Sequence, residues 1–229
     1  MSNEIVLIVF YIAILLYSVI IHEVFHGVMA LWLGDNTAKY AGRLTANPLS
    51  HLDFIGSFVA PLLMYLSFGF AFGWAKPVPY NPYNLKNQKW GPALVALAGP
   101  GINLLVAFVA AIIAKLITIP LLLKEDIIRN VNEWDKVSEV IAGSMGAIFF
   151  ELLMMVIVFN VFLAFFNLIP IPPLDGSKLL FAIFPIKIET QAMLEQFGFM
   201  LLLFFIFFFS SPLVKFLQIA ISPFLWLAT

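Results

Sequence analysis

The 229-residue sequence contains no cysteine. Disulfides and thiolate metal sites are therefore excluded, and any metal site has to use histidine or carboxylate ligands. Charged residues are also scarce, at 11% of the chain, where soluble domains average about 25%. The net charge of −1 gives no indication of a nucleic-acid partner. The N-terminus has neither a basic region nor a small-residue cleavage site, so we expect the first apolar helix to be retained.

Hydrophobic residues make up 62% of the chain, which indicates a polytopic membrane protein embedded in a lipid bilayer, since soluble domains contain about 45–50%. We expect an all-α fold with about five or six membrane segments. Residues 1–229 are expected to form a single domain, with a catalytic core at about 5–187 and C-terminal membrane segments at about 193–229. The apolar runs predict helices at 5–33, 93–114, 152–169 and 196–229, the last of which is either one kinked helix or a two-helix hairpin.

The pentapeptide H-E-V-F-H at residues 22–26 interrupts the first apolar helix. Residues four apart lie on one helix face, so His22 and His26 can bind one metal ion, and neutral imidazole is a good zinc ligand. Glu23 lies between them, where it can take a proton from a zinc-bound water. A histidine on an apolar face is more often a satisfied core residue. However, the preceding residues 5–21 carry no charge, and an ionisable group inside a membrane suggests a functional site.

A second unusual stretch, N-L-I-P-I-P-P-L-D-G, occupies residues 167–176. Its three prolines end the preceding helix and favour an extended segment, because proline has no backbone donor and a fixed φ. Asp175 is thereby held on a non-helical stretch, which survives at membrane depth only inside the protein or along a cavity. A structural turn aspartate is the simpler interpretation. Asn167 lies eight residues before Asp175, on the other side of the prolines, and its presence strengthens the interpretation that Asp175 is a functional residue.

Together these residues resemble the site-2 protease family of intramembrane zinc metalloproteases. The resemblance depends chiefly on the motifs at 22–26 and 167–176, with A-G-P-G-I-N at 98–103 as lesser support. Residues 42–53 and 72–82 are similar to the small, single-domain branch that lacks a PDZ domain.

The resemblance implies a role for each matching residue. His22, His26 and Asp175 would bind Zn²⁺, Glu23 would be the general base, and Asn167 would help to hold the substrate or its reacting carbonyl. The implied activity is an endopeptidase that cuts transmembrane segments of other proteins with a zinc-activated water. Two histidines and one carboxylate leave a fourth zinc position open, as catalytic sites require. Zinc is preferred to iron or cobalt on ligand type and on the resemblance.

Residues 37–53 are polar, and the residue types around Gly42 predict a small β-hairpin or an irregular loop. We expect a strand edge near residues 38–47 to accept the substrate by β-addition, which would present an unwound segment to the metal. Asn47 lies in this segment and is a candidate substrate-binding residue. His51 is a weaker candidate metal ligand, because the downstream carboxylate fits the third position better.

The proposed ligands restrict the topology. For the downstream carboxylate to reach the histidines, loop 76–92 has to lie on the membrane face where the first helix ends. Residues 54–75 then cannot cross once, so we expect a re-entrant segment or one bent at Pro61 or near Gly69. The alternative is that residues 54–75 span the membrane, with the site near its middle and reached from both sides. The excess of lysine and arginine on that face predicts that it is cytoplasmic, in what we expect is the cell membrane.

Two alternatives remain open from the sequence. One is another membrane zinc hydrolase, such as a prenyl-protein-type protease, although that class pairs H-E-x-x-H with a downstream glutamate on a helix. The other is a non-catalytic metal-binding or metal-transport membrane protein, which would usually carry polar groups in several spans or inverted repeats.

Overall fold

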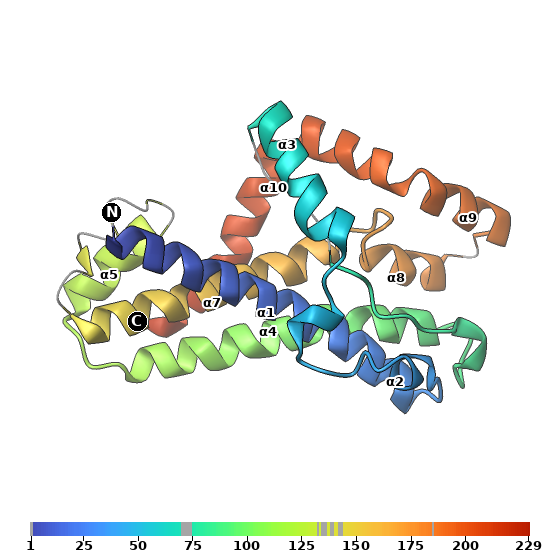
Figure 1. The fold of residues 1–229 in the computed structure, drawn as a ribbon, viewed down its shortest axis with the longest axis horizontal. Coiled ribbons are helices and arrows are strands. Elements are labelled where there is room, and N and C mark those ends of the chain that lie inside the picture. The colour runs from blue at the N-terminus through green and yellow to red at the C-terminus, as the bar shows by residue number, and fades with distance from the viewer. Residues whose placement is uncertain are drawn as a thin grey trace.

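The fold is a helical membrane bundle (Figure 1). The computed structural model describes residues 2–69, 75–131, 133, 137, 140–141, 144–184 and 186–229. Within these residues every regular element is a helix or a helical turn, and four helices are long and apolar enough to cross a membrane. The all-α membrane class is therefore confirmed, whereas five or six membrane segments are not. The four long helices are α1 (Ser2–Trp32), α4 (Gly91–Leu116), α7 (Met145–Asn167) and α10 (Gly198–Ala228).

Shorter elements connect the long helices. The first connection, from α1 to α4, contains two short helices and three helical turns, and the connection from α4 to α7 contains the polar helix α5. The short helices are α2 (Thr37–Tyr40), α3 (Ala60–Phe68), α5 (Leu121–Asn130), α8 (Gly176–Ile183) and α9 (Ile188–Gln196), and the turns are η1 (Pro48–Ser50), η2 (Ile55–Val59) and η3 (Pro82–Asn84).

Helices α1, α4 and α7 pack against one another and alternate in direction, so the end of α1, the start of α4 and the end of α7 lie at the same end of the bundle (Figure 1). Helix α4 makes this close packing possible because most of its buried residues are small, and small residues let helix backbones approach in a membrane. These residues are Gly91, Ala93, Ala96, Gly99, Ala107, Ala110, Ala111 and Ala114.

A buried polar contact joins α1 to α7 near their other ends. Tyr11 donates a hydrogen bond from its hydroxyl to Glu151, which is fully buried. A carboxyl group removed from water needs such a partner, because an unsatisfied polar group inside a protein is costly.

The predicted β-hairpin within residues 37–53 is wrong. Residues 37–40 form the short helix α2, and Gly42 follows with a positive φ of 65°. Asn47 then caps the turn η1 by accepting a hydrogen bond from the Leu49 amide. Pro48 stands at the start of this turn, where it has no N–H to donate to a strand ladder. The prediction of a substrate-binding strand edge at 38–47 is also wrong, because the structure describes no strand there.

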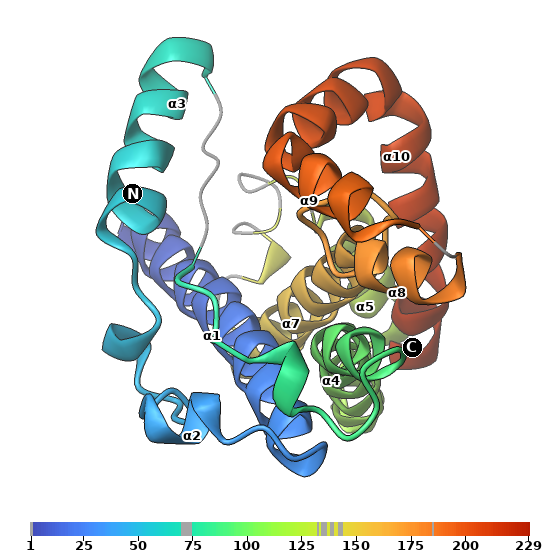
Figure 2. The same cartoon turned by 90° about the vertical axis from the view of Figure 1, so that its right-hand side faces the viewer.

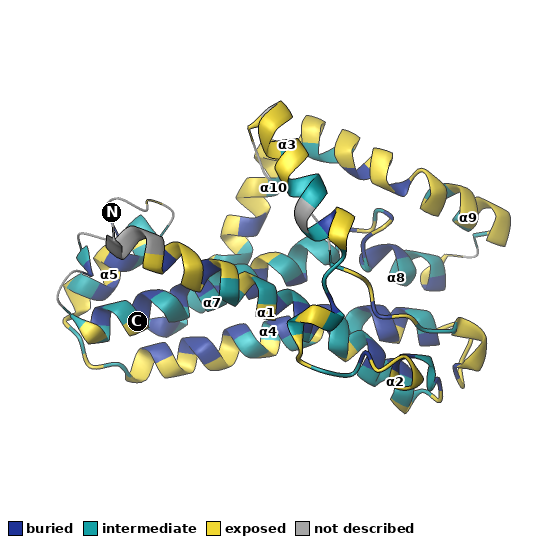
Figure 3. Cartoon of the chain, viewed as in Figure 1, coloured by how far each residue is buried: buried dark blue, intermediate teal, exposed yellow. Residues whose placement is uncertain are grey.

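The segment that carries η2 and α3 begins and ends at one place. The Lys76 amide donates to the His51 carbonyl at 2.9 Å, and the Arg43 guanidinium donates to the Lys76 carbonyl at 2.7 Å. Figure 2 shows α3 standing beside the bundle, and Figure 3 shows its largely exposed surface. Of the two positions considered for a bend, Pro61 lies in the first turn of α3, and Gly69 ends α3 with a positive φ of 77°. Residues 70–74 fall outside the described part.

Asp35 joins the end of α1 to the loop that precedes α4. Its buried carboxylate accepts hydrogen bonds from the Thr37 hydroxyl at 2.6 Å, the Asn81 amide at 2.7 Å and the Asn84 side chain at 2.8 Å. Burial alone would raise the pKa of the Asp35 carboxyl, but these hydrogen bonds hold the pKa below its usual value. The contact places the two loops at the same end of the bundle.

The C-terminal apolar run is one kinked helix rather than a hairpin. Helix α10 departs from helical φ and ψ at Phe209, three residues before Pro212. A proline inside a helix removes one hydrogen bond and clashes with the carbonyl four residues earlier, so a kink at this point is expected.

This arrangement predicts which loops share a membrane face. The chain has no cysteine, so single cysteines placed at exposed Lys39, Gln88 and Asp126 can be labelled without background. We expect the first two to react from one side of sealed vesicles and the third from the other side. Labelling of Lys39→Cys and Gln88→Cys from opposite sides would contradict the fold.

Candidate metal centre

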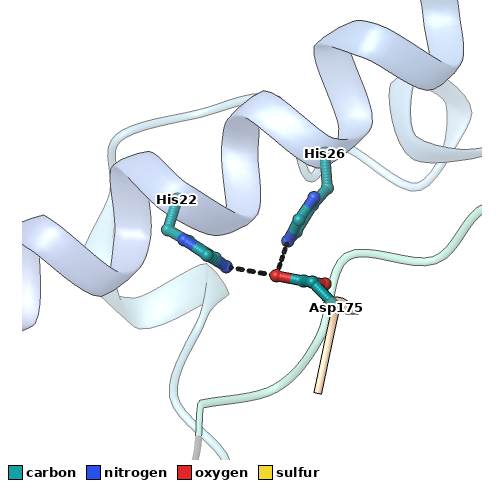
Figure 4. A group of neighbouring side chains, drawn as sticks. All are labelled: His22, His26 and Asp175. Carbon is teal, nitrogen blue, oxygen red and sulfur yellow. Dashed lines mark hydrogen bonds and ion pairs between the residues drawn. The ribbon is translucent and has the colours of Figure 1, made fainter. Parts of the chain in front are cut away.

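Three side chains from distant parts of the chain converge on one point (Figure 4). His22 Nε2 lies 3.0 Å from Asp175 Oδ2, and His26 Nε2 lies 3.4 Å from the same oxygen. The side chains of His22 and His26 are 6% and 11% exposed, and that of Asp175 is 20% exposed. The cluster is therefore largely shielded from water, with its open side at the carboxylate.

The local sequence explains how each ligand is placed. The histidines occupy successive turns of α1, and their rings meet edge to face with centroids 4.6 Å apart. Asp175 stands at the N-cap position of α8, directly after the proline-rich turn. Gly176 lets this turn close, because a Cβ at that position would lie 2.2 Å from the Leu168 carbonyl oxygen.

Both histidines are held through Nδ1, which directs Nε2 towards the carboxylate. His26 Nδ1 lies 2.7 Å from the Val95 carbonyl oxygen, and His22 Nδ1 lies 2.6 Å from Asn103 Oδ1. A carbonyl oxygen can only accept a hydrogen bond, so each Nδ1 has to carry a proton. In the neutral ring, the Nε2 lone pair then points at Asp175.

These donors fit a divalent cation. The Asp175 carboxylate supplies the anionic ligand of such a site, and both Nε2 atoms face its Oδ2. Two neutral imidazoles that aim lone pairs at an anion repel it, unless the rings are protonated or a cation lies between them. Tetrahedral zinc with bonds of about 2.0–2.2 Å separates its ligand atoms by about 3.3–3.6 Å, close to the observed 3.0 and 3.4 Å.

Gly99 on α4 forms the wall against which both imidazoles pack. A Cβ there would lie 2.5 Å from His26 Cε1 and 2.7 Å from His22 Cε1. Only a residue without a side chain fits at these distances, so α4 contributes shape as well as the two carbonyl acceptors.

Glu23 lies next to His22 on α1 and contacts the loop at residues 76–78. The Val78 amide donates to Glu23 Oε2 at 2.9 Å. The hydrogen bonds of Lys76 to His51 and Arg43 position this loop, and Gly27 lets Val78 pack closely against α1.

The other residues singled out from the sequence make local contacts. Asn167 is the last residue of α7 and donates from Nδ2 to the Leu163 carbonyl at 2.9 Å. Asn47 is exposed and caps η1. His51 is buried, and its Nε2 lies 2.8 Å from the Thr45 carbonyl oxygen, so that nitrogen is engaged away from the metal ligands. Asn103 was noted in the sequence only as part of a motif, and its contact with His22 was not anticipated.

The comparisons with known proteins agree with this site. Residues 10–205 match the family described as Peptidase family M50. The chain is 32% identical over 204 residues to the protein described as "Putative zinc metalloprotease YwhC" from Bacillus subtilis (strain 168), a match that covers 87% of this chain and 79% of that protein. No solved structure matches the chain.

These matches favour the first of the three interpretations that the sequence left open. The family match spans both motifs that supply the clustered side chains, and the relative is described as a putative zinc metalloprotease. The chain is therefore a membrane zinc metalloprotease that belongs to peptidase family M50, the site-2 protease family.

Proposed function

We propose that the protein cuts peptide bonds within transmembrane segments of other proteins. His22, His26 and Asp175 would hold the zinc ion, and Glu23 would move the proton. The observation that carries this proposal is the convergence of two Nε2 atoms and one carboxylate oxygen at the end of three membrane helices. This ligand set leaves one zinc position open for catalysis.

The residues around the metal have separate tasks. Zinc, when bound, supplies Lewis acidity that activates water and polarises a peptide carbonyl. Glu23 would accept a proton from the attacking water and pass it to the leaving amine. Its Oε2 is held by the Val78 amide, so we assign proton transfer to Oε1. The Val78 contact fixes the direction of this carboxylate before a substrate arrives.

We further propose that the η2–α3 segment is re-entrant. Ile55–Val59 and Ala60–Phe68 together contain 14 helical residues, about 21 Å in length, which is shorter than a membrane core of roughly 30 Å. The hydrogen bond between His51 and Lys76 brings the two ends of the segment together, as a segment that enters and leaves by one membrane face requires.

The active-site face is proposed to be cytoplasmic, in the cell membrane. The positive-inside rule assigns the face richer in lysine and arginine to the cytoplasm. Among the described residues, the lysines and arginines that we place on the active-site side are Lys39, Arg43, Lys76, Lys86, Lys89, Lys178 and Lys187, against Lys115, Lys124 and Arg129 on the other side.

Asn167 and Asn47 are proposed to bind the substrate. Asn167 ends α7 directly before the turn that carries Asp175, and its side chain is partly exposed. An amide at this position can hydrogen-bond an extended peptide backbone. Asn47 lies in the exposed loop after α2, so its contact would be with substrate outside the metal cluster.

Replacing Glu23 tests the function directly. Glu23→Gln keeps an oxygen that can accept from the Val78 amide, so we expect bound zinc to be retained. Cleavage of reconstituted single-span helices should fall by about 10²–10⁴-fold, the usual contribution of a general base. Zinc content and cleavage are measured on the same detergent-purified samples.

Exposed Glu125 on α5 supplies the matched control, since Glu125→Gln should leave zinc and cleavage unchanged. Full activity in Glu23→Gln would refute the base assignment. Cleavage of soluble peptides without cleavage of any single-span helix would refute the substrate class.

Alanine substitutions at two glycines of α4 test whether the space beside the imidazoles is needed for metal binding. Gly99→Ala places a methyl group against both imidazoles, whereas a Cβ at Gly101 would meet no atom within 4 Å. We expect Gly99→Ala to lose zinc binding and cleavage, and Gly101→Ala to keep both. Equal zinc content in the two variants, measured after purification, would show that the histidines do not bind the metal in this arrangement.

A further inference from the structure

A chain of buried amides leads from the metal cluster across three membrane helices. We propose that Asn103 is a positioning residue that fixes the tautomer of His22, and that Asn160 and Ser18 hold the Asn103 amide in the orientation this requires. The inference rests on the proposed zinc site and adds the device that keeps one of its ligands ready to bind metal.

The direction of each hydrogen bond follows from backbone carbonyls, which can only accept. Asn103 lies 3.2 Å from the Ser18 carbonyl oxygen through the atom assigned as Nδ2. Because a carbonyl oxygen requires a donor, this assignment is correct, and the opposite atom of the amide is Oδ1. Oδ1 is the atom 2.6 Å from His22 Nδ1, so His22 has to donate there and keeps its lone pair on Nε2.

Asn160 provides a second, independent anchor for the same orientation. Its Nδ2 donates to the Val156 carbonyl at 2.9 Å and to Ser18 Oγ at 2.8 Å, so its Oδ1 faces Asn103 Nδ2 at 2.6 Å. Ser18 Oγ in turn donates to the Ile14 carbonyl at 2.8 Å. The hydrogen bonds among Ser18, Asn103 and Asn160 can therefore all be satisfied in only one orientation of the two amides.

Reversing the Asn103 amide would break this pattern. Its oxygen would then face two acceptors, the Ser18 carbonyl and Asn160 Oδ1, and its NH₂ group would face His22 Nδ1. His22 would be left with its proton on Nε2, the nitrogen that faces Asp175. That tautomer cannot bind a metal through Nε2, so the anchors on α1 and α7 select the tautomer that can.

Burial makes this selection strong. Asn103 is 0% exposed, Asn160 1% and Ser18 4%. None of these three residues can therefore exchange its hydrogen-bond partner for water without opening the helix bundle. Buried amides can also serve as simple contacts between membrane helices. A simple contact between helices requires only that each amide has hydrogen-bond partners. The Asn103 amide also contacts His22, a proposed metal ligand.

The test compares zinc affinity in the full-length protein purified in detergent, by competition with a chelator of known affinity. Asn103→Leu should weaken zinc binding by about 10–100-fold, the usual effect of losing a hydrogen-bond partner of a ligating histidine. Asn160→Leu should weaken it less, because Asn103 keeps its contact with the Ser18 carbonyl. Met154→Ala, which removes a buried apolar side chain from α7 and none of these hydrogen bonds, should lower the unfolding temperature and leave zinc affinity unchanged.

Asn103→Asp separates positioning from packing, and it carries the test if Asn103→Leu fails to fold. One carboxyl oxygen still accepts from His22 Nδ1, and the other faces the Ser18 carbonyl and Asn160 Oδ1, so it has to carry a proton to replace the amide donor. We therefore expect zinc affinity to stay well above that of Asn103→Leu. A loss in this variant as large as in Asn103→Leu would overturn the proposal.

Nitrogen-15 spectra of histidine give a direct readout, because the chain has only three histidines. His51 presents Nε2 to the Thr45 carbonyl and therefore serves as an internal Nε2–H reference. After chelation at a pH where the rings are neutral, His22 and His26 should show the Nδ1–H form, and Asn103→Leu should remove this preference from His22 alone.

Two results would overturn the proposal: zinc affinity in Asn103→Leu within twofold of the unaltered protein, or an equal loss of affinity in Met154→Ala. An unaltered protein that binds no zinc would instead refute the proposed function, so the two failures can be told apart.

Discussion

The structure depends on the direction of two nitrogen lone pairs. His22 and His26 each donate a hydrogen bond from Nδ1 to an oxygen of α4, so both Nε2 atoms face Asp175. Without that constraint each ring could donate to the carboxylate through Nε2, and the three side chains would satisfy one another with no place for a cation. Helix α4 is therefore as much a part of the proposed metal centre as the two segments that would supply its ligands.

Close helix packing makes this arrangement possible. Gly99 brings the α4 backbone against both imidazoles, and the alanines along the same helix let α1 and α7 approach it. In lipid there is little hydrophobic driving force between helices, so van der Waals packing and interhelical hydrogen bonds have to hold the bundle together. The same packing excludes water from the ligands and strengthens their electrostatic interactions.

Much of this site could be predicted from the sequence because it follows from local rules. His22 and His26 share a helix face by spacing alone, and the prolines before Asp175 indicate a stiff, non-helical segment. That segment forms consecutive turns rather than the extended stretch predicted. The partners of Asn103 could not be predicted, because they depend on how α4 rotates against α1 and α7. The hairpin prediction failed because it weighed residue types around Gly42 and overlooked Pro48 and the capping side chain of Asn47. The ends of α1, α4 and α10 were close to those observed, because apolar runs with few charges mark them directly. Helix α7 begins at Met145 rather than at the predicted residue 152, because buried Glu151 lies inside it.

The order in which the ligands are made has its own consequence. Asp175 lies 153 positions after His22, which at roughly 5–20 residues per second takes a ribosome about 8–30 s to add. Throughout that interval the nascent chain holds two imidazoles without the carboxylate that completes their set. With the proposed ligand set incomplete, the metalloprotease is inactive while α4 and α7 are being made and inserted.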